Sequence, residues 1–237
     1  MTGRGKRAIY ISIGATVIIL LLLIPIIMNI SPSIDLGELD IEIRNDRCNI
    51  SAKLLFSPDI ETENEELDLA LENATLPINF KKDRAAITLD ENQFREIMDR
   101  EKIRIVGGLD AKPLPFWRTF KKVDQNVDLS FISELVDSIE ISNMELIPSP
   151  PRNMLLNFDL TADIEHDVTI SIIDTRAKIT ASTSEHEVVI KELLISTDSV
   201  GYGSVEVRSS TLLALLQGEI EIDAWGITVR FDLPMDI

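Results

Sequence analysis

The chain begins with a long uncharged run, residues 8–30, in which apolar side chains predominate. At about 1.5 Å of rise per residue, a helix over this run is about 35 Å long, enough to cross a hydrocarbon core of about 30 Å. Arg4, Lys6 and Arg7 precede the run, so the positive-inside rule places residues 1–7 in the cytoplasm. The pattern therefore predicts a single-pass plasma-membrane protein whose remaining residues are extracytoplasmic.

A cleaved secretory signal is the alternative interpretation of this run. The apolar core of such a signal is usually about 7–15 residues long and ends at a cleavage site with small residues. Here the run is longer, and its end, residues 25–30, contains no Ala-x-Ala pattern. A retained transmembrane helix is therefore the favoured interpretation.

Beyond the run, short segments in which apolar and polar residues alternate predict β-strands. The clearest is the last, where Ile227, Val229 and Phe231 alternate with polar residues. A period of two places one side-chain type on each face, which is typical of antiparallel sheets with one face in a core. Similar alternation occurs at Phe158 and Leu160, at Val188 and Ile190, at Val205 and Val207, and at Ile220, Ile222 and Ala224. We therefore expect a mainly all-β fold.

Two short helices interrupt the β pattern. Asp90 is a suitable N-cap for the first, whose apolar residues Phe94, Ile97 and Met98 fall on one helical face. The second covers residues 210–216 and ends before a glycine. We expect both helices to be packing elements rather than partner sites.

The order strand, short helix, strand occurs twice, at 86–106 and at 204–224. A duplication of about 95 residues explains this recurrence, since internal repeats at a fixed period indicate repeated structural units. The sequence thus predicts two tandem antiparallel β-sandwich units, at 34–136 and 138–237, each with one short helix. The two units would join near residues 133–138.

In the second half, the helix and strand of 204–224 are followed by the pattern Gly-x-x-x-x-Phe-x-x-Pro at 226–234. This arrangement resembles the late embryogenesis abundant group 2 family, also called the water-stress and hypersensitive-response (WHy) domain family. In the first half, residues 87–106 fit the strand, helix and strand order of the family. In the second half, His166-Asp167 stands at the turn where the family usually has Asn-Pro. The resemblance implies an antiparallel sandwich with one helix per unit and a stress-protective or binding role without catalysis.

Charge narrows the choice of partners for the extracytoplasmic part. All 40 Asp and Glu residues lie beyond the apolar run, and the formal net charge is −17. Such a surface repels nucleic acid and anionic headgroups. We therefore expect no nucleic-acid partner.

Cys48 is the only cysteine, so an intramolecular disulfide is excluded, and we expect this residue to be a structural thiol.

Few residues suit catalysis or ligand chemistry. The only histidines, His166 and His186, do not accompany a nucleophile signature, and the chain has too few Cys and His residues for a zinc site. We predict no catalytic, cofactor-binding or metal-binding residues, and we do not expect an enzyme. The acidic segment 59–66 leaves a bound calcium ion as an alternative, because calcium takes carboxylate ligands. Acidic residues that alternate along 159–167 are better explained as the solvated face of a strand.

Two surface features carry further predictions. Asn49 and Asn73 match the N-glycosylation acceptor pattern in the extracytoplasmic part. A second group is both aromatic and basic and is a candidate for contact with the membrane surface, where Trp and Lys are common. Its members are Phe116, Trp117, Lys121 and Lys122. The alternative for this group is an ordinary hairpin with inward aromatic rings.

Together these patterns favour a membrane-anchored protein with a non-catalytic binding or stress-protective role at the outer face of the membrane. One alternative is a structural subunit of a cell-envelope complex, with envelope proteins as partners. Another is a carrier of lipid or an apolar ligand, which requires an open seam between two sheets. The ligand and the oligomeric state do not follow from the sequence.

Overall fold

The computed structural model describes residues 33–57, 61–72, 74–81, 84–114, 117–181, 184–211 and 219–232. Strands account for most of these residues, so the prediction of a mainly all-β chain is confirmed. The predicted tail 1–7 and span 8–30 lie outside the described residues. Within the described part, no helix is both long and apolar enough to cross a membrane.

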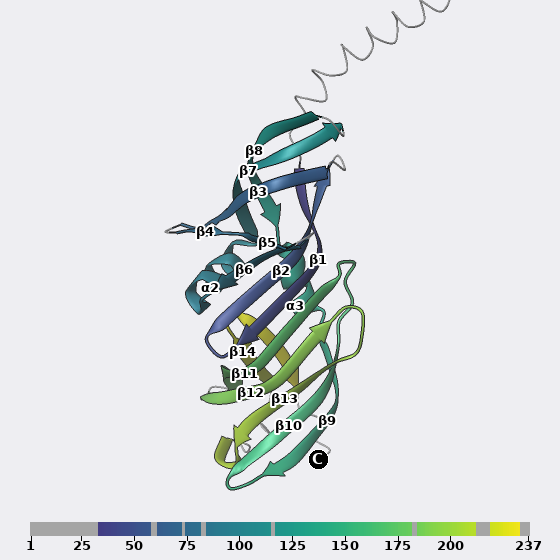
Figure 1. Cartoon of the computed structure of the whole chain (residues 1–237). Coiled ribbons are helices and arrows are strands. Elements are labelled where there is room, and N and C mark those ends of the chain that lie inside the picture. The colour runs from purple at the N-terminus through teal and green to yellow at the C-terminus, as the bar shows by residue number, and fades with distance from the viewer. Residues whose placement is uncertain are drawn as a thin grey trace, which may run out of the picture.

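The strands form two sheets (Figure 1). The smaller sheet has the order β4-β3-β7-β8, with β3 at Glu61–Ala70, β4 at Thr75–Pro77, β7 at Lys102–Leu114 and β8 at Trp117–Asp128. The larger sheet has the order β5-β6-β2-β1-β11-β12-β13-β10-β9, and β14 pairs with both β11 and β15. Its first-half strands are β1 (Ser33–Arg44), β2 (Arg47–Ser57), β5 (Asn79–Lys81) and β6 (Arg84–Leu89). Its second-half strands are β9 (Glu140–Ser149), β10 (Asn153–Thr161), β11 (Val168–Ala181), β12 (Ser184–Ser196), β13 (Gly201–Arg208), β14 (Glu219–Ala224) and β15 (Ile227–Asp232).

A parallel pair, β1 with β11, joins the two halves into one sheet. Residues 39–44 of β1 pair with residues 168–173 of β11, in a register that places Ile41 beside Ile170 and Ile43 beside Ile172. All four of these isoleucines are buried in one core cluster that contains residues of both halves. The halves therefore share a sheet and a core, and the division into units at 34–136 and 138–237 stays a prediction.

The order of strand pairing recurs in the two halves. In the first half, β2 pairs with β6, and β7 pairs with both β3 and β8. In the second half, β10 pairs with β13, and β14 pairs with both β11 and β15. Helix α2 (Glu91–Arg100) lies between β6 and β7 in the chain, and residues 209–211 are helical between β13 and β14. Residues 212–218, most of the second predicted helix, lie outside the described part.

Helix α2 begins where the sequence predicts. The Asp90 side chain accepts a hydrogen bond from the backbone N–H of Gln93 at 2.9 Å, and the Gln93 side chain accepts one from the Asp90 backbone N–H at 3.0 Å. This reciprocal capping box satisfies two backbone donors at the helix start. Phe94 and Ile97 are buried and Met98 packs against the same core. The predicted cap and apolar face are both confirmed.

The segment between the halves is a helix that the sequence analysis missed. Helix α3 (Ser130–Asp137) covers most of the expected junction at 133–138. Its residues Phe131, Ile132 and Leu135 are buried, so one face packs into the core. The helix lacks a side-chain N-cap, which removed the usual start signal from the sequence.

Candidate ligand cavity

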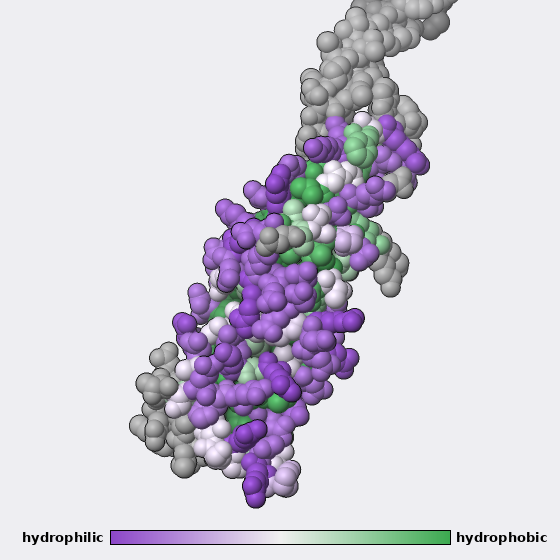
Figure 2. All heavy atoms as spheres, turned by 90° about the vertical axis from the view of Figure 1, so that its left-hand side faces the viewer, coloured by the Kyte–Doolittle hydropathy of each residue, from purple (hydrophilic) through white to green (hydrophobic). Residues whose placement is uncertain are grey.

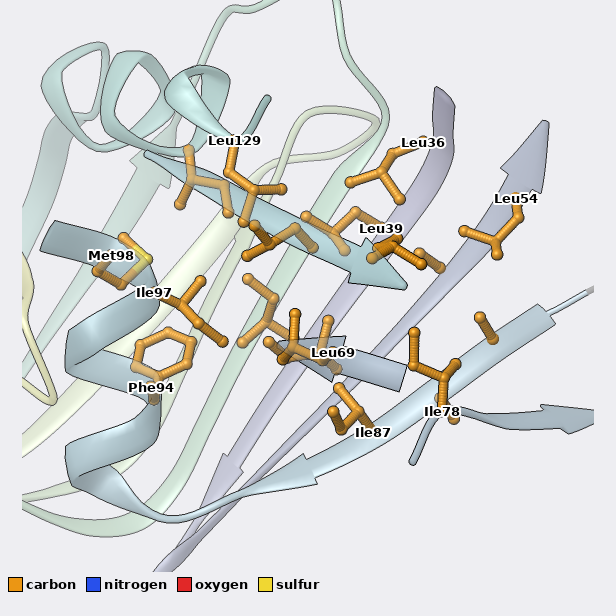
Figure 3. Close-up of a pocket in the computed structure, with 18 residues that line it drawn as sticks. Leu36, Leu39, Leu54, Leu69, Ile78, Ile87, Phe94, Ile97, Met98 and Leu129 are labelled. Atoms are coloured by element: carbon orange, nitrogen blue, oxygen red, sulfur yellow. The ribbon is translucent and has the colours of Figure 1, made fainter. Parts of the chain in front are cut away.

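A cavity of about 60 Å³ lies between the two sheets of the first half (Figure 3). Strands β1, β2 and β6 contribute one wall, β3 and β7 contribute the facing wall, and α2 lies at one end. Every lining residue is apolar. The lining consists of Leu36, Leu39, Ile41, Ile50, Ala52, Leu54, Leu69, Ile78, Ala85, Ala86, Ile87, Phe94, Ile97, Met98, Ile103, Ile105, Leu129 and Ile132.

Two small residues explain why space remains here. Ala52 of β2 and Ala85 of β6 are direct cross-strand partners, and both are buried. Their single methyl groups leave the centre of this wall shallow, while larger side chains such as Leu69 line the facing sheet. Leu39 of β1, the other neighbour of Ala52, is a larger side chain, so the shallow part is limited to β2 and β6. The cavity is thus a consequence of register and residue size.

The cavity also lies where the buried core is discontinuous. One core cluster contains residues of the second half together with Leu39 and Phe94, and the other contains first-half residues such as Ile105. Among cavity-lining residues, Leu36, Ile78 and Ile103 pack against both clusters but are only partly buried. The two clusters therefore meet across an incompletely filled space.

This space has a free-energy cost in the empty protein. Unfilled cavities destabilise proteins by about 24 cal/mol per Å³, so about 60 Å³ corresponds to about 1.4 kcal/mol. Water gains little here, because a buried water needs about three polar partners and the lining offers none. An apolar group that enters the cavity regains the lost contacts. The site is therefore suited to an apolar ligand.

The predicted glycosylation sites have different outcomes. Asn49 is an exposed residue of β2, where its neighbours on the two flanking strands are Glu42 and Thr88. Its side-chain oxygen accepts a hydrogen bond from the Thr88 hydroxyl at 2.8 Å. Asn73 lies outside the described residues. The modification of both stays a prediction.

The predicted membrane-contact group lies at the β7–β8 hairpin. Phe116 is outside the described residues, and Trp117 begins β8 but its side chain is not described. Lys121 is half-buried and Lys122 is exposed. The neighbouring Phe120 is 70% exposed, and its ring lies so close to Gly108 that a Cβ there would be 2.2 Å away. This hairpin lies at the end of the molecule where β1 begins (Figure 1).

Cysteine and histidine lie apart in the structure. Cys48 is fully buried in β2, and burial raises the pKa of its thiol to about 12, so the thiol is protonated at neutral pH. His166 stacks on Phe131 with ring centroids 4.6 Å apart, and His186 lies on β12. These three side chains belong to different elements and do not form a common site.

The two acidic segments have different structures. Strand β10 ends at Thr161, so the expectation of a continuous strand face along 159–167 is wrong, and its last acidic residues lie in a loop. Glu63, in the segment 59–66, is hydrogen-bonded to Lys112, and its Oε2 atom lies 2.9 Å from Nη2 of Arg118. These two cations lower the pKa of Glu63. Among the described residues, no three His, Cys, Asp or Glu side chains are placed to hold a metal ion.

Comparison with known proteins leaves the family open. No protein-family model matches this chain, and no similar sequence is found among curated proteins. The resemblance to the late embryogenesis abundant group 2 family therefore stays a prediction. The carrier alternative required an open seam between two sheets, but the cavity itself was not located from the sequence. Its signal is the alanines Ala52, Ala85 and Ala86 on strands otherwise rich in larger apolar residues, and only the strand register brings them together.

Proposed function

We propose that this chain is a membrane-anchored, extracytoplasmic binding protein that holds the apolar chain of an amphiphile, such as a lipid, between the two sheets of its first half. Residues 8–30 would supply the anchor, and no catalysis is involved. The observation that carries this proposal is the cavity whose 18 lining residues are all apolar. The surrounding surface is mostly hydrophilic on the face shown in Figure 2.

The size of the cavity indicates how a chain would fit. About 60 Å³ has room for about four water-sized spheres, which suits the end of an acyl chain rather than its whole length. Met98 and Leu54, near opposite ends of the cavity in Figure 3, are side chains with several rotamers. A longer insertion would displace them without breaking the strand ladders. Ligand uptake then requires side-chain motion rather than separation of the sheets.

The position of the β7–β8 hairpin supports a site close to the membrane. Strand β1 begins at Ser33, three residues after the predicted span, and β1 starts at the same end as this hairpin (Figure 1). The exposed ring of Phe120 and the ammonium group of Lys122 are suited to a headgroup region. A lipid would then travel only a short distance from the bilayer to the cavity.

The recurrent pairing order supports two tandem sandwich units of the late embryogenesis abundant group 2 type. In the second half, the strand pair that corresponds to β2 and β6 is β10 and β13, where Phe158 is the partner of Gly203. The Phe158 ring covers that glycine, since a Cβ there would be 2.2 Å from the ring, and Phe158 is buried. The second unit would thus be filled where the first is open, so only the first would bind a ligand.

Native mass spectrometry of the full chain, extracted with its own lipids, tests this function. We expect wild type to retain one amphiphile more than Ala52→Leu, whose larger side chain fills the cavity. Lipids held by residues 8–30 are common to both proteins and therefore cancel. A stoichiometric protein partner would instead favour the alternative of a cell-envelope subunit.

The matched control is Lys53→Leu, which adds the same side chain at the next position of β2, on the opposite face. Lys53 does not line the cavity, so this variant should retain the amphiphile. Equal retention by wild type, Ala52→Leu and Lys53→Leu would contradict the proposed function.

A further inference from the structure

A second, open cleft of about 510 Å³ adjoins the apolar cavity. It lies between the start of β1, the end of β8 and the first turns of α3. Leu36 lines both spaces and is only half-buried, so its side chain is the wall between them. A ligand that reaches from the apolar cavity into the cleft would pass this residue.

The backbone around Leu36 leaves this route open. From Leu39 onward, β1 pairs with β11, whereas residues 33–36 pair only with β2 among the described strands. The β1–β2 register also shifts between Leu36 and Leu39, so the ladder is irregular there. In the lining of the cleft, the Gln125 side chain accepts a hydrogen bond from the Ile34 N–H and donates one to the Ile34 C=O, both at 2.9 Å. This amide closes the seam between β1 and β8 on one side of the cleft.

The cleft is mainly acidic. Three carboxylates line it, from Asp35, Asp128 and Glu134. Its described lining contains no Lys or Arg, and its one other ionisable side chain is His166, whose ring stacks on Phe131. Hydrogen bonds from the Ser130 backbone N–H and hydroxyl lower the pKa of Asp128, which is therefore ionised at neutral pH. All three acidic residues are exposed, so they are accessible to a ligand.

We infer that this cleft binds the polar end of the same amphiphile whose chain occupies the cavity, and that it selects a cationic amine or a neutral hydroxyl head over an anionic one. This inference rests on the proposed function. Continuity past Leu36 links the two spaces, and charge complementarity sets the preference. The carboxylates attract an ammonium group, accept hydrogen bonds from a hydroxyl group and repel a phosphate or carboxylate.

The test compares three probes that share one chain: dodecylamine, 1-dodecanol and laurate. Trp225 reports on the cavity, because its ring centroid is 6.2 Å from that of Phe94, which lines it. The full chain in nanodiscs, with Trp117→Phe so that a single tryptophan remains, is titrated with each probe. We expect dodecylamine to bind several-fold more tightly than laurate, with dodecanol between them.

The decisive variant is Asp35→Asn/Asp128→Asn/Glu134→Gln, which keeps the shape of the cleft. This variant should lower the ratio of dodecylamine affinity to laurate affinity to the value expected for a cleft without charged side chains. Its affinity for dodecanol should stay unchanged. The matched control removes three exposed carboxylates of the second half that do not line the cleft, at Glu140, Glu145 and Asp198. This control has the same net charge and should keep the wild-type ratio.

The outcomes separate the two proposals. If dodecanol binds but the cleft variant and the control give the same ratio, the inference about the cleft is wrong and the cavity still binds chains. If none of the three probes changes Trp225 emission in the Trp117→Phe protein relative to the same protein with Ala52→Leu, the proposed function itself fails.

Discussion

Filling the cavity from within should stabilise the protein, and Ala52→Val is the cleanest perturbation. Valine adds two carbon atoms to a buried position, which is worth about 1.6 kcal/mol at about 0.8 kcal/mol per buried methylene. The cavity volume gives a similar figure, because about 60 Å³ at about 24 cal/mol per Å³ is about 1.4 kcal/mol. Position 52 lies within β2, where a β-branched residue is also favourable.

The assay is urea unfolding of the full, delipidated chain, followed by tryptophan emission. We expect Ala52→Val to raise the free energy of unfolding by about 1.5 kcal/mol with an unchanged denaturant slope, or to raise Tm by about 3–6 °C. Delipidation matters, because a bound chain would already fill the space and would reverse the sign of the effect.

Ala181→Val is the matched control for this prediction. Ala181 is 1% exposed and has a strand neighbour on each side, Ser184 and Ile220, but it does not line the cavity. The same two carbon atoms there overpack the core and should cost about 1–3 kcal/mol. The two variants should therefore shift stability in opposite directions. If Ala52→Val destabilises the chain as Ala181→Val does, the argument from the cavity is refuted.

Three further predictions follow from particular contacts. Phe158→Ala should lower the free energy of unfolding by about 3–5 kcal/mol, because it empties the space over Gly203. A loss below about 1 kcal/mol in urea unfolding would show that this ring does not fill the core of the second half. The Cys48 thiol has a folded pKa of about 12 against 9.0 for the free group, so its contribution is intact below pH 9.0 and is lost as pH rises towards 12. Wild type should therefore lose stability relative to Cys48→Ala over that interval in pH-dependent unfolding, and parallel curves would contradict the burial argument. A fluorophore attached to Phe120→Cys should be quenched by spin-labelled lipids in nanodiscs. A fluorophore attached to Ile147→Cys, an exposed position of β9 at the opposite end of the molecule, should not be quenched. Equal quenching of the two would exclude membrane contact at the β7–β8 hairpin.

Local features of the fold could be predicted from the sequence. The alternating residues Val205 and Val207 are buried in β13, as expected, because a period of two follows directly from strand geometry. Asp90 caps α2 for an equally local reason. Helix α3 was missed because its apolar face lies in a short segment whose N-cap residue, Leu129, offers no side-chain cap.

The arrangement of the halves and the cavity could not be predicted in the same way. The parallel pairing of β1 with β11 joins residues that are about 130 positions apart, and no local pattern encodes such a partner. The cavity depends on Ala52 and Ala85 being side by side, which a shift of the register by two residues would abolish. Single alanines in strands are common, so neither residue signals a site until the pairing is known.

The two halves fill the space over their paired strands in different ways, and this difference connects stability to the proposed binding. Where β10 and β13 pair, a buried phenylalanine lies over a glycine and completes the core. Where β2 and β6 pair, two alanines leave a space that costs about 1.4 kcal/mol when empty. The parallel β1–β11 pair places both regions in one sheet, so the well-packed half supports the open one through shared isoleucines. The cavity therefore lies between a core cluster shared by both halves and a smaller cluster of the first half, and these two clusters can keep it open before a ligand enters, as is usual for ligand pockets.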